Sequence, residues 1–306
     1  MKFEAELKKE GIMFIKNYSV KKASNFRVGG RVSYYITPRG EEELCAALKI
    51  IRKEGKRYMA AGRLTNVLFC DSDIDMALIG MTPWFDNIGL KGKDRVVAGA
   101  GVTNAELLDF MASKSLSGAE FLAGIPGTVG GAVYMNAGAF GRNISGIIAK
   151  IRYADKNGRI REMGPERAGF AYRHSCFHEN GGIITAAEIK AKKSDKKEIK
   201  AVIRGIIGLR HRKHPWKAAC AGSFFRNTPD ISAGKLVELA GMKGASVGGA
   251  EVSQQHGNFI INRKNASFRD VIALSEKVKK AVYKKFGVRL KEEVVIVRKK
   301  NGRFHG

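Results

Sequence analysis

The segment 124–140 has the residue types and spacing of a loop that could bind an anionic group. Its residues are G-I-P-G-T-V-G-G-A-V-Y-M-N-A-G-A-F, in which small side chains recur throughout. Closely spaced glycines let backbone N–H groups surround a pyrophosphate, because no Cβ blocks the approach. The pattern alone fits a purely structural glycine loop equally well, so the rest of the chain must decide between the two interpretations.

The first elements that must position this loop form a small α/β unit over residues 1–78. Residues 41–54 open with three acidic residues, place leucine and isoleucine at helical spacing and stop before Gly55. This combination predicts a helix. Short apolar stretches at 32–36 and 76–79 predict strands on either side of it.

Residues 79–194 predict a second α/β unit that contains the glycine-rich segment. A strand at 95–98 precedes Thr103, whose Thr-x-x-Glu spacing forms a capping box for a helix that ends at Met111. The stretches 147–153 and 160–163 flank Asn157-Gly158, a pair that tolerates the positive φ of a tight hairpin turn. A further strand is expected over 183–191.

Residues 195–306 predict a third unit. It begins with a lysine-rich stretch and a helix through residues 199–206. A second capping box, Ser-x-x-Asp at 267–270, opens another helix, with an apolar face that recurs to Phe286 and Gly287 at its end. The β-branched stretch 288–297 predicts a final strand, which could return to the first unit.

Composition restricts the class of protein but does not identify a binding partner. The chain has 306 residues, 44% of them hydrophobic, and no apolar run long enough to cross a bilayer, which indicates an ordered cytoplasmic protein of two or three domains. Its 4 cysteines are far apart, so neither a metal site nor a disulfide framework is expected. The formal charge of +26 would attract any anionic partner, so it does not select one. The simplest interpretation is a basic surface exposed to solvent.

Several segments in the same order resemble the UDP-N-acetylenolpyruvoylglucosamine reductase (MurB) family. The glycine-rich segment is similar to the family's GIPGTVGGAVYMNAGAF signature, and this similarity decides in favour of a cofactor loop. Five further elements match, namely F-R-V-G-G at 26–30, Y-R-H-S at 172–175, A-G-S-F-F-R-N at 221–227, G-G-A-E-V-S at 248–253 together with Asn258-Phe259 and Asn262, and the stretch 290–294. The chain resembles the shorter branch of the family, because no room remains for the extra substrate-tyrosine segment.

The resemblance implies an α+β, three-domain flavoprotein. Two α/β domains of the vanillyl-alcohol oxidase type would hold non-covalent FAD, and a C-terminal α+β domain would cover the substrate. It also implies the reaction, in which NADPH reduces the flavin and the UDP-enolpyruvyl sugar then takes hydride from flavin N5 at its vinyl C3. A proton at C2 would complete UDP-N-acetylmuramate for peptidoglycan synthesis.

Three residues match the family's catalytic positions. Hydride addition builds negative charge on the enolpyruvyl carboxylate, and the resemblance assigns Arg173 to stabilise it through a fixed fork of donors. Ser223 matches the proton donor, and Glu293 matches the acid near the substrate. Glu292 is adjacent, so the alignment could shift by one residue, although the spacing to Leu290 favours Glu293.

The remaining site residues also follow from the resemblance. Those expected to hold the substrate are Tyr172, Lys213 as a point charge for the diphosphate, Asn227 and His256. Those expected to hold FAD come from three stretches, and they are Arg27, Gly62, Arg63, Leu64, Thr65, Asn66, Gly124, Ile125, Pro126, Gly127, Thr128, Gly130, Gly131, Asn136, Ala137 and Gly138.

Departures from the family pattern leave the proposed catalytic groups untouched. Leu64 replaces a glycine, which would cost on the order of 1 kcal/mol if the position needs positive φ. Asn25 stands where threonine is frequent, and His214 where glutamine is frequent. The stretch Gly99 to Asn104 resembles the glycine-rich fingerprint of dinucleotide-binding proteins, but Asn104 stands in place of the third glycine. No acidic residue follows at the expected distance after a second strand.

Alternative functions remain open at this point. Another FAD-dependent oxidoreductase of the same fold would share the glycine loop, and an inactive relative would share most of the motifs. A basic nucleic-acid-binding protein would share the charge and bind with a steep dependence on salt.

Overall fold

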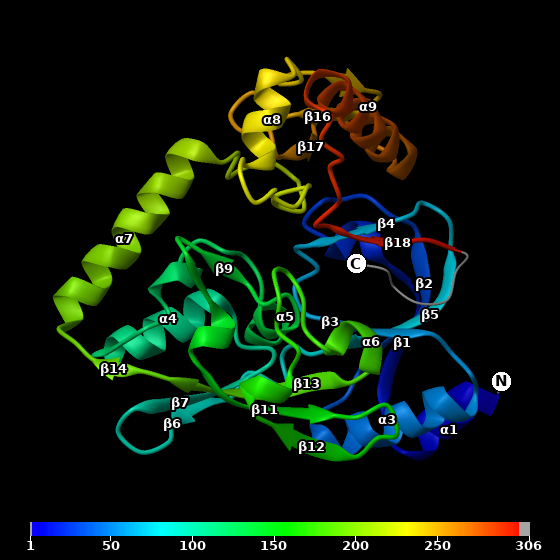
Figure 1. Ribbon diagram of the computed structural model, residues 1–306. Coiled ribbons are helices and arrows are strands. Elements are labelled where there is room, and N and C mark those ends of the chain that lie inside the picture. The colour runs from blue at the N-terminus through cyan, green and yellow to red at the C-terminus, as the bar shows by residue number, and fades with distance from the viewer. Residues whose placement is uncertain (1, 300–306) are drawn as a thin grey trace. The chain divides into compact units, whose positions relative to one another are not determined.

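The computed structural model describes residues 2–299, which divide into two compact units. Within the described residues, unit 1 consists of 2–17, 33–62 and 75–208, and unit 2 of 18–32, 63–74 and 209–299. Most helices and strands of both units are labelled in Figure 1. Among residues 2–299, no helix is long and apolar enough to span a bilayer.

The first sheet of unit 1 has the strand order β1-β2-β5-β3, with β3 and β5 parallel. Two helices, α1 and α3, belong to this region, and α3 begins and ends as its sequence indicates. Its first turn carries three glutamates, its buried side chains include Leu44, Leu48 and Ile51, and Gly55 follows with a φ of 60°. The bounds are α1 Lys2–Lys9, β1 Met13–Ser19, β2 Arg31–Thr37, α3 Glu41–Lys53, β3 Tyr58–Ala61 and β5 Ile74–Gly80.

The second sheet of unit 1 has the order β12-β11-β13-β7-β6, and all neighbouring strands are antiparallel. Its middle strand, β13, is buried along both faces, and α5 packs against it (Figure 1). The predicted hairpin and strands are confirmed. The bounds are β6 Ile88–Leu90, β7 Arg95–Gly99, β11 Ile148–Ala154, β12 Ile160–Met163 and β13 Ile183–Lys190.

Short elements connect these strands. Thr103 caps α4 through the expected capping box, with its hydroxyl accepting from the Glu106 N–H at 3.1 Å. The bounds are α4 Asn104–Ser113, β8 Leu116–Ser117, η1 Glu120–Leu122, α5 Val129–Tyr134, β9 Gly138–Ala139, β10 Arg142–Asn143, η2 Ile144–Gly146, η3 Pro165–Arg167, α6 Phe177–Asn180, β14 Lys192–Lys193 and α7 Lys196–Lys213. One cluster of buried apolar side chains runs from Phe3 to Ala191, so the two sheets of unit 1 share a core.

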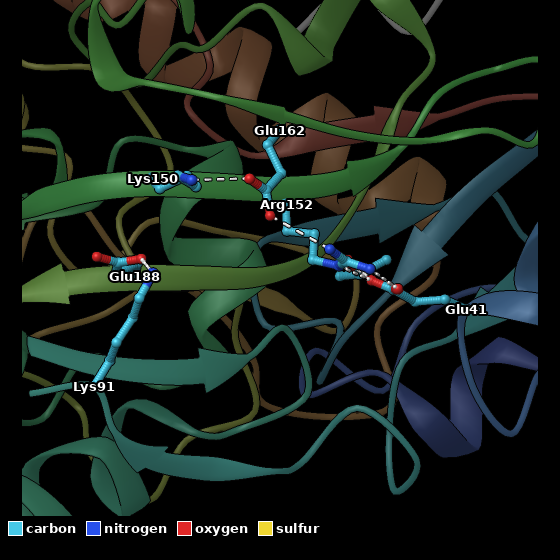
Figure 2. Close-up of polar contacts among 7 residues, drawn as sticks. Glu41, Lys91, Lys150, Arg152, Glu162 and Glu188 are labelled. Atoms are coloured by element: carbon cyan, nitrogen blue, oxygen red, sulfur yellow. Dashed lines mark hydrogen bonds and ion pairs between the residues drawn. The ribbon is translucent and has the colours of Figure 1, made fainter.

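A network of ion pairs lies over the second sheet (Figure 2). The Arg152 guanidinium on β11 holds the Glu41 carboxylate at the start of α3, with N···O distances of 2.7 and 2.8 Å. Lys150 pairs with Glu162 at 2.9 Å across the hairpin. Hydrogen bonds from the Arg152 side chain lower the pKa of Glu41. The bidentate pair therefore ties α3 to β11.

The same sheet contains a second acidic centre at Glu188 on β13. The Lys91 ammonium lies 2.7 Å and the Arg95 guanidinium 2.6 Å from its carboxylate oxygens. Hydrogen bonding from Lys91, with a further bond from Arg95, lowers the pKa of this carboxyl. Two cations thus neutralise a carboxylate that is itself nearly buried.

Unit 2 contains short strands and one long helix. Ser267 caps α9 through the second predicted capping box, and Gly287 ends it with a φ of 68°. The predicted apolar face consists of five residues, and four of them are buried, namely Val271, Leu274, Val278 and Val282. The fifth, Phe286, lies in the last turn and is 36% exposed. The bounds are α2 Val20–Ala23, β4 Val67–Phe69, α8 Ala233–Leu239, β15 Ser246–Val247, β16 Ala250–Val252, β17 Ile260–Asn262, α9 Phe268–Phe286 and β18 Val295–Val297.

The final strand is shorter than predicted. Only Val295–Val297 form β18, which pairs in parallel with β4. The residues just before it bond instead to the segment around Phe225, through an isolated bridge from Phe225 to Glu292 and a bond from the Arg226 N–H to the Lys291 carbonyl. Because the chain changes its partner between these two pairings, no continuous ladder can form over residues 288–297. The division into domains at 1–78, 79–194 and 195–306 stays a prediction.

Candidate active site

The glycine-rich segment of unit 1 lies against the loop that follows β7. The Asn104 N–H donates to the Gly127 carbonyl at 3.1 Å, and the Val129 N–H donates to the Val102 carbonyl at 2.8 Å. The Asn104 side chain also donates to the Ile125 carbonyl at 3.0 Å. These bonds fix the course of the loop before it enters α5.

Several glycines of the segment are required by contacts within the protein. A Cβ on Gly130 would lie 2.8 Å from the Ala100 Cβ, and one on Gly138 would lie 2.5 Å from the Arg142 carbonyl oxygen. A Cβ on Gly62 would lie 2.7 Å from the Thr128 hydroxyl. Gly62 and Thr128 come from two different predicted FAD-binding stretches, so unit 1 brings these stretches into direct contact.

The backbone around Gly127 and Gly131 is less crowded, so a ligand could approach it. Gly127 has a φ of 132°, which only glycine adopts readily, and a Cβ on Gly131 would meet nothing closer than 3.7 Å. Within residues 2–299, the N–H groups of Gly127 and Thr128 take no part in the backbone bonds that anchor the loop. Two adjacent N–H groups beside an accessible glycine are what an anionic pyrophosphate needs.

The fingerprint-like stretch after β7 has a different explanation. A Cβ on Gly99 would overlap the Phe85 carbonyl, and one on Gly101 would overlap the Met81 carbonyl. The Gly101 N–H donates to the Phe85 carbonyl at 2.7 Å. These glycines therefore allow close packing of two chain segments, and the weak fingerprint carries no information about phosphate.

The turn that carries Tyr172 and Arg173 is attached to the end of the glycine-rich segment. The Asn136 side chain donates to the Ala171 carbonyl at 2.9 Å, and the Ser175 hydroxyl donates to the Tyr134 carbonyl at 2.7 Å. Unit 1 thus places the predicted cation directly beside the predicted FAD loop.

The guanidinium of Arg173 is held at several points. It donates to the Gly138 carbonyl at 3.3 Å and lies 5.0 Å from the centre of the Tyr172 ring. Its backbone has a φ of 55°, which non-glycine residues rarely adopt. A left-handed backbone of this kind is held in place only by the surrounding contacts, and it is consistent with the predicted role of Arg173.

In unit 2, the segment with Ser223 lies beside the segment with Glu293. The Glu293 N–H donates to the Phe224 carbonyl at 2.8 Å, one residue after Ser223. Glu292 instead points its carboxylate at Lys279 on α9, with an ion-pair distance of 2.7 Å. The ion pair commits Glu292 to α9 and so favours Glu293 as the site carboxylate.

The loop of Arg63, Leu64, Thr65 and Asn66 belongs to the same part of unit 2. The Asn66 side chain donates to the Glu293 carbonyl at 3.3 Å, and its own carbonyl accepts from the Val295 N–H at 3.0 Å. Leu64 has a φ of 48° and is 7% exposed. The position does require positive φ, so burial of the leucine side chain must offset a strain of about 1 kcal/mol.

Arg27 lies in another strained turn of unit 2. Its φ is 56°, and the Asn262 side chain donates to its carbonyl at 3.3 Å. Asn25, the residue that departs from the family pattern, donates from its side chain to the Cys220 carbonyl at 2.7 Å. The substituted asparagine therefore fixes the chain just ahead of Ser223.

Two of the predicted substrate residues meet at the first turn of α8. The Asn227 side-chain oxygen accepts from the Ala233 N–H at 3.0 Å, and the His256 ring packs closely against Gly234. Lys213 is the last residue of α7, and its charge contributes to lowering the pKa of His256, after desolvation and Lys243. Nδ1 of His256 accepts from the Asn258 N–H at 3.1 Å, so the neutral ring carries its proton on Nε2.

His214 packs beside His256 and Phe259 at centroid distances of 5.2 and 5.0 Å. Desolvation, with the positive neighbours Arg210 and Lys213, lowers the pKa of His214 to about 4. The ring is therefore neutral at neutral pH. Both histidines in this cluster pack against their neighbours, and His256 also accepts a hydrogen bond through its ring.

The predicted site residues thus form two groups. Unit 1 gathers Gly62, the residues 124–138, Tyr172 and Arg173, and unit 2 gathers Arg27, the residues 63–66, Ser223, Asn227, His256 and Glu293. Convergence of Arg173 with Ser223 and Glu293 on one substrate stays a prediction. No cluster of three or more histidine, cysteine or acidic residues that could hold a metal occurs in the described part of the chain.

Comparison with known proteins identifies the family. A FAD-binding domain model matches residues 32–164, and a model of the UDP-N-acetylenolpyruvoylglucosamine reductase C-terminal domain matches residues 214–297. The UDP-N-acetylenolpyruvoylglucosamine reductase of Anoxybacillus flavithermus is 38% identical over 278 residues, which cover 90% of this chain and 92% of that protein. The chain belongs to the UDP-N-acetylenolpyruvoylglucosamine reductase family.

Solved structures agree with this assignment. The crystal structure of the family member from Thermus caldophilus matches with a TM-score of 0.80 and 31% identity, covering 94% of this chain and 98% of that one. A glucose dehydrogenase, Phl p 4.0202, matches with a TM-score of 0.52 and 17% identity over 64% of this chain and 45% of that one, which shows a shared fold alone. The α+β fold class with a FAD-binding domain of the oxidase type is confirmed.

Proposed function

We propose that this chain reduces UDP-N-acetylenolpyruvoylglucosamine to UDP-N-acetylmuramate, with NADPH as reductant, in the cytoplasmic stage of peptidoglycan synthesis. The family supports the substrate and the reaction, and the FAD-binding model supports the cofactor. The N–H groups of Gly127 and Thr128, which donate to no backbone carbonyl among residues 2–299, suit the FAD pyrophosphate. Bound FAD supplies the hydride that the vinyl C3 receives.

Arg173 is the proposed partner of the enolpyruvyl carboxylate. Negative charge grows on that carboxylate as hydride arrives, and a guanidinium already held in place stabilises it without reorganising. The bond to Gly138 and the Tyr172 ring provide this preorganisation. Tyr172 would form the wall of the substrate site at this point.

Ser223 is the proposed proton donor to C2, and Glu293 is the proposed carboxylate beside it. The observation that carries this assignment is the bond from the Glu293 N–H to the Phe224 carbonyl, because it sets the two segments side by side within one unit. The Asn66 side chain, in the predicted FAD loop, donates to the Glu293 carbonyl, so this loop also contacts the Glu293 segment. A proton donor, a carboxylate and a cofactor loop are the parts that this reduction requires.

The sugar nucleotide would extend from Ser223 toward α8. Asn227 and His256 both lie at the first turn of that helix, and Lys213 contributes a positive charge near His256. Lysine suits a diphosphate as a compact charge with rotatable donors. The neutral His256 ring would donate from Nε2.

The two half-reactions test this function separately. An absorption spectrum of the purified protein should show bound flavin, and under anaerobic conditions NADPH should bleach it. Stopped-flow mixing with the enolpyruvyl substrate should then restore the flavin spectrum much faster than oxygen does. Rapid reoxidation by oxygen alone would support the rival function, an oxidase of the same fold.

Substitution of Ser223 tests the proposed proton donor. Ser223→Ala should slow the enolpyruvyl-dependent step by roughly 10²- to 10⁴-fold, because a positioned general acid contributes about that much. Reduction by NADPH does not use this proton and should change little. Equal loss in both half-reactions would argue that the serine serves the structure or the flavin instead.

A further inference from the structure

Asn258 bonds to the segment that carries Ser223 from across 33 residues of sequence. Its side-chain oxygen accepts from the Phe225 N–H at 2.9 Å, and its side-chain nitrogen donates to the Phe225 carbonyl at 2.8 Å. Its own backbone carbonyl accepts from the Phe224 N–H at 2.7 Å. Only 3% of Asn258 is exposed, so water cannot replace these bonds.

The amide of Asn258 takes the place of a neighbouring strand. A carboxamide presents one acceptor and one donor in a plane, as a peptide group does, and can therefore pair with both backbone groups of a single residue. On its other side the same segment bonds to residues 291–293, through the Arg226 N–H to the Lys291 carbonyl and the Glu293 N–H to the Phe224 carbonyl. Residues 224–226 are thus held from two sides.

The turn that contains Asn258 also reaches the proposed substrate residues. The Asn258 N–H is accepted by Nδ1 of His256 at 3.1 Å, and the His256 ring packs against Gly234 at the start of α8. The side-chain oxygen of Asn227 accepts from the neighbouring Ala233 N–H in that turn. One short turn therefore connects the proposed proton donor with the proposed sugar-nucleotide end of the site.

We propose that Asn258 is a positioning residue that sets the Ser223 hydroxyl for proton delivery, by holding Phe225 in register between itself and the Glu293 segment. The inference rests on the proposed function of Ser223. It goes beyond that function because the Asn258 side chain bonds to the Phe225 backbone and would act on the reaction only through the position of Ser223. A displacement of the proton donor by about 1 Å costs on the order of 10²-fold in rate. Loss of the clamp should produce a displacement of this kind.

The first test compares half-reactions in the full-length holoenzyme. Asn258→Ala should slow the enolpyruvyl-dependent oxidation of reduced flavin by about 10- to 100-fold and leave reduction by NADPH within about threefold. Ser267→Ala is the matched control, because it removes the cap of α9 in the same unit and does not touch residues 223–227 or 291–293. Ser267→Ala should lower stability and leave both half-reactions within about threefold. An equal effect of the two variants on the enolpyruvyl step would overturn the proposal.

A double variant separates this inference from the proposed function. On the Ser223→Ala background, Asn258→Ala should cause no further slowing, because its effect passes through Ser223. Multiplicative slowing would overturn the positioning role. A Ser223→Ala variant with an unchanged enolpyruvyl step would overturn the proposed proton donor, whereas a slow Ser223→Ala beside a normal Asn258→Ala would overturn only the inference about Asn258.

Hydrogen exchange gives a readout that does not depend on activity. In Asn258→Ala the Phe225 amide should exchange faster, because its acceptor is gone, while amides of β18 keep their protection. Asn258→Asp preserves an acceptor for this N–H and loses the donor, so it should restore part of the Phe225 protection. It also serves as the test variant if Asn258→Ala does not fold. Unchanged Phe225 protection in both variants would contradict the clamp.

Discussion

The two groups of site residues are held in place by different means. In unit 1 the predicted FAD loop and the Arg173 turn belong to the region of a five-stranded antiparallel sheet, and glycines permit the close contacts between segments. In unit 2 the site segments have ladders of only two or three residues, and asparagine side chains supply the missing backbone partners. Where regular structure is short, amide side chains replace it, since buried backbone groups must still be paired.

This difference gives each unit a characteristic weakness. A site held by close glycine contacts fails when volume is added, because neighbouring backbone cannot move far. A site held by asparagines fails when a polar group is removed, because its buried partner is left unpaired. The four predictions that follow probe these weaknesses, beginning with the largest expected effect.

Gly130→Ala should lower the free energy of unfolding by about 2–3 kcal/mol through overpacking. The added Cβ would lie 2.8 Å from the Ala100 Cβ and 3.1 Å from its carbonyl oxygen. Gly131→Ala is the matched control, because the nearest atom is 3.7 Å away, and its stability should stay within about 1 kcal/mol. Chemical denaturation of the apoproteins measures both, and similar losses would remove close packing as the reason for glycine at residue 130.

Asn25→Ala should lower the free energy of unfolding by about 1–2 kcal/mol, because the Cys220 carbonyl loses the side-chain donor at 2.7 Å. The effect should be concentrated in unit 2, with faster amide exchange near residue 220 and unchanged exchange in β13. Asn157→Ala in the hairpin turn of unit 1 serves as a control, because its side chain also accepts a hydrogen bond, from Arg52, but does so at the surface, where water can replace it. A uniform change in exchange across both units would show that Asn25 does not act locally.

His214 should make the stability of unit 2 depend on pH. Its pKa falls from the ordinary 6.5 to about 4, so above pH 6.5 the ring is neutral in both the folded and the unfolded states. As the pH falls from 6.5 toward 4, only the unfolded state gains the proton, so stability decreases, by about 1 kcal/mol over the whole window once the full linkage value is reduced for solvent screening of a partly exposed ring. Urea titrations of the native chain and of His214→Gln should differ in this window, and parallel curves would assign the pH dependence to other groups.

Lys150→Ala should have the smallest effect, below about 0.5 kcal/mol. Lys150 and Glu162 form a solvent-exposed pair at 2.9 Å, and exposed pairs gain little over hydration. Arg152→Ala is the instructive comparison, because it removes the bidentate contact to Glu41 and should cost more (Figure 2). Thermal unfolding at low and high salt measures both variants, and an equal cost would show that the link from β11 to α3 contributes nothing.

Local patterns were sufficient for many elements of this chain. Both capping boxes, the hairpin at Asn157-Gly158 and the stop at Gly287 are interactions between residues a few positions apart, and each is present as predicted. The family pattern raised positive φ at Leu64 only as a condition, and the structure shows that this condition holds. The family motifs identified the candidate site residues, although their roles stay predictions.

Other features depended on partners that are distant in sequence. The final strand shrank to Val295–Val297 because the residues before it pair with the segment around Phe225, and periodicity alone cannot show such a change of partner. Asn25 looked like a neutral departure, and Asn258 was one residue of a motif, until their bonds to Cys220 and Phe225 were seen.

The amino-acid sequence by itself determined the family and the beginnings and ends of the main helices, and it predicted the cofactor loop, because these depend on residue identity and on neighbours within one or two turns. Only the tertiary structure decided which backbone groups the asparagines satisfy and which of two adjacent glutamates is committed to Lys279. Burial is the reason, because a buried polar group cannot bond to water. It must bond to a protein group that the fold places beside it, and that group can be far away in the sequence.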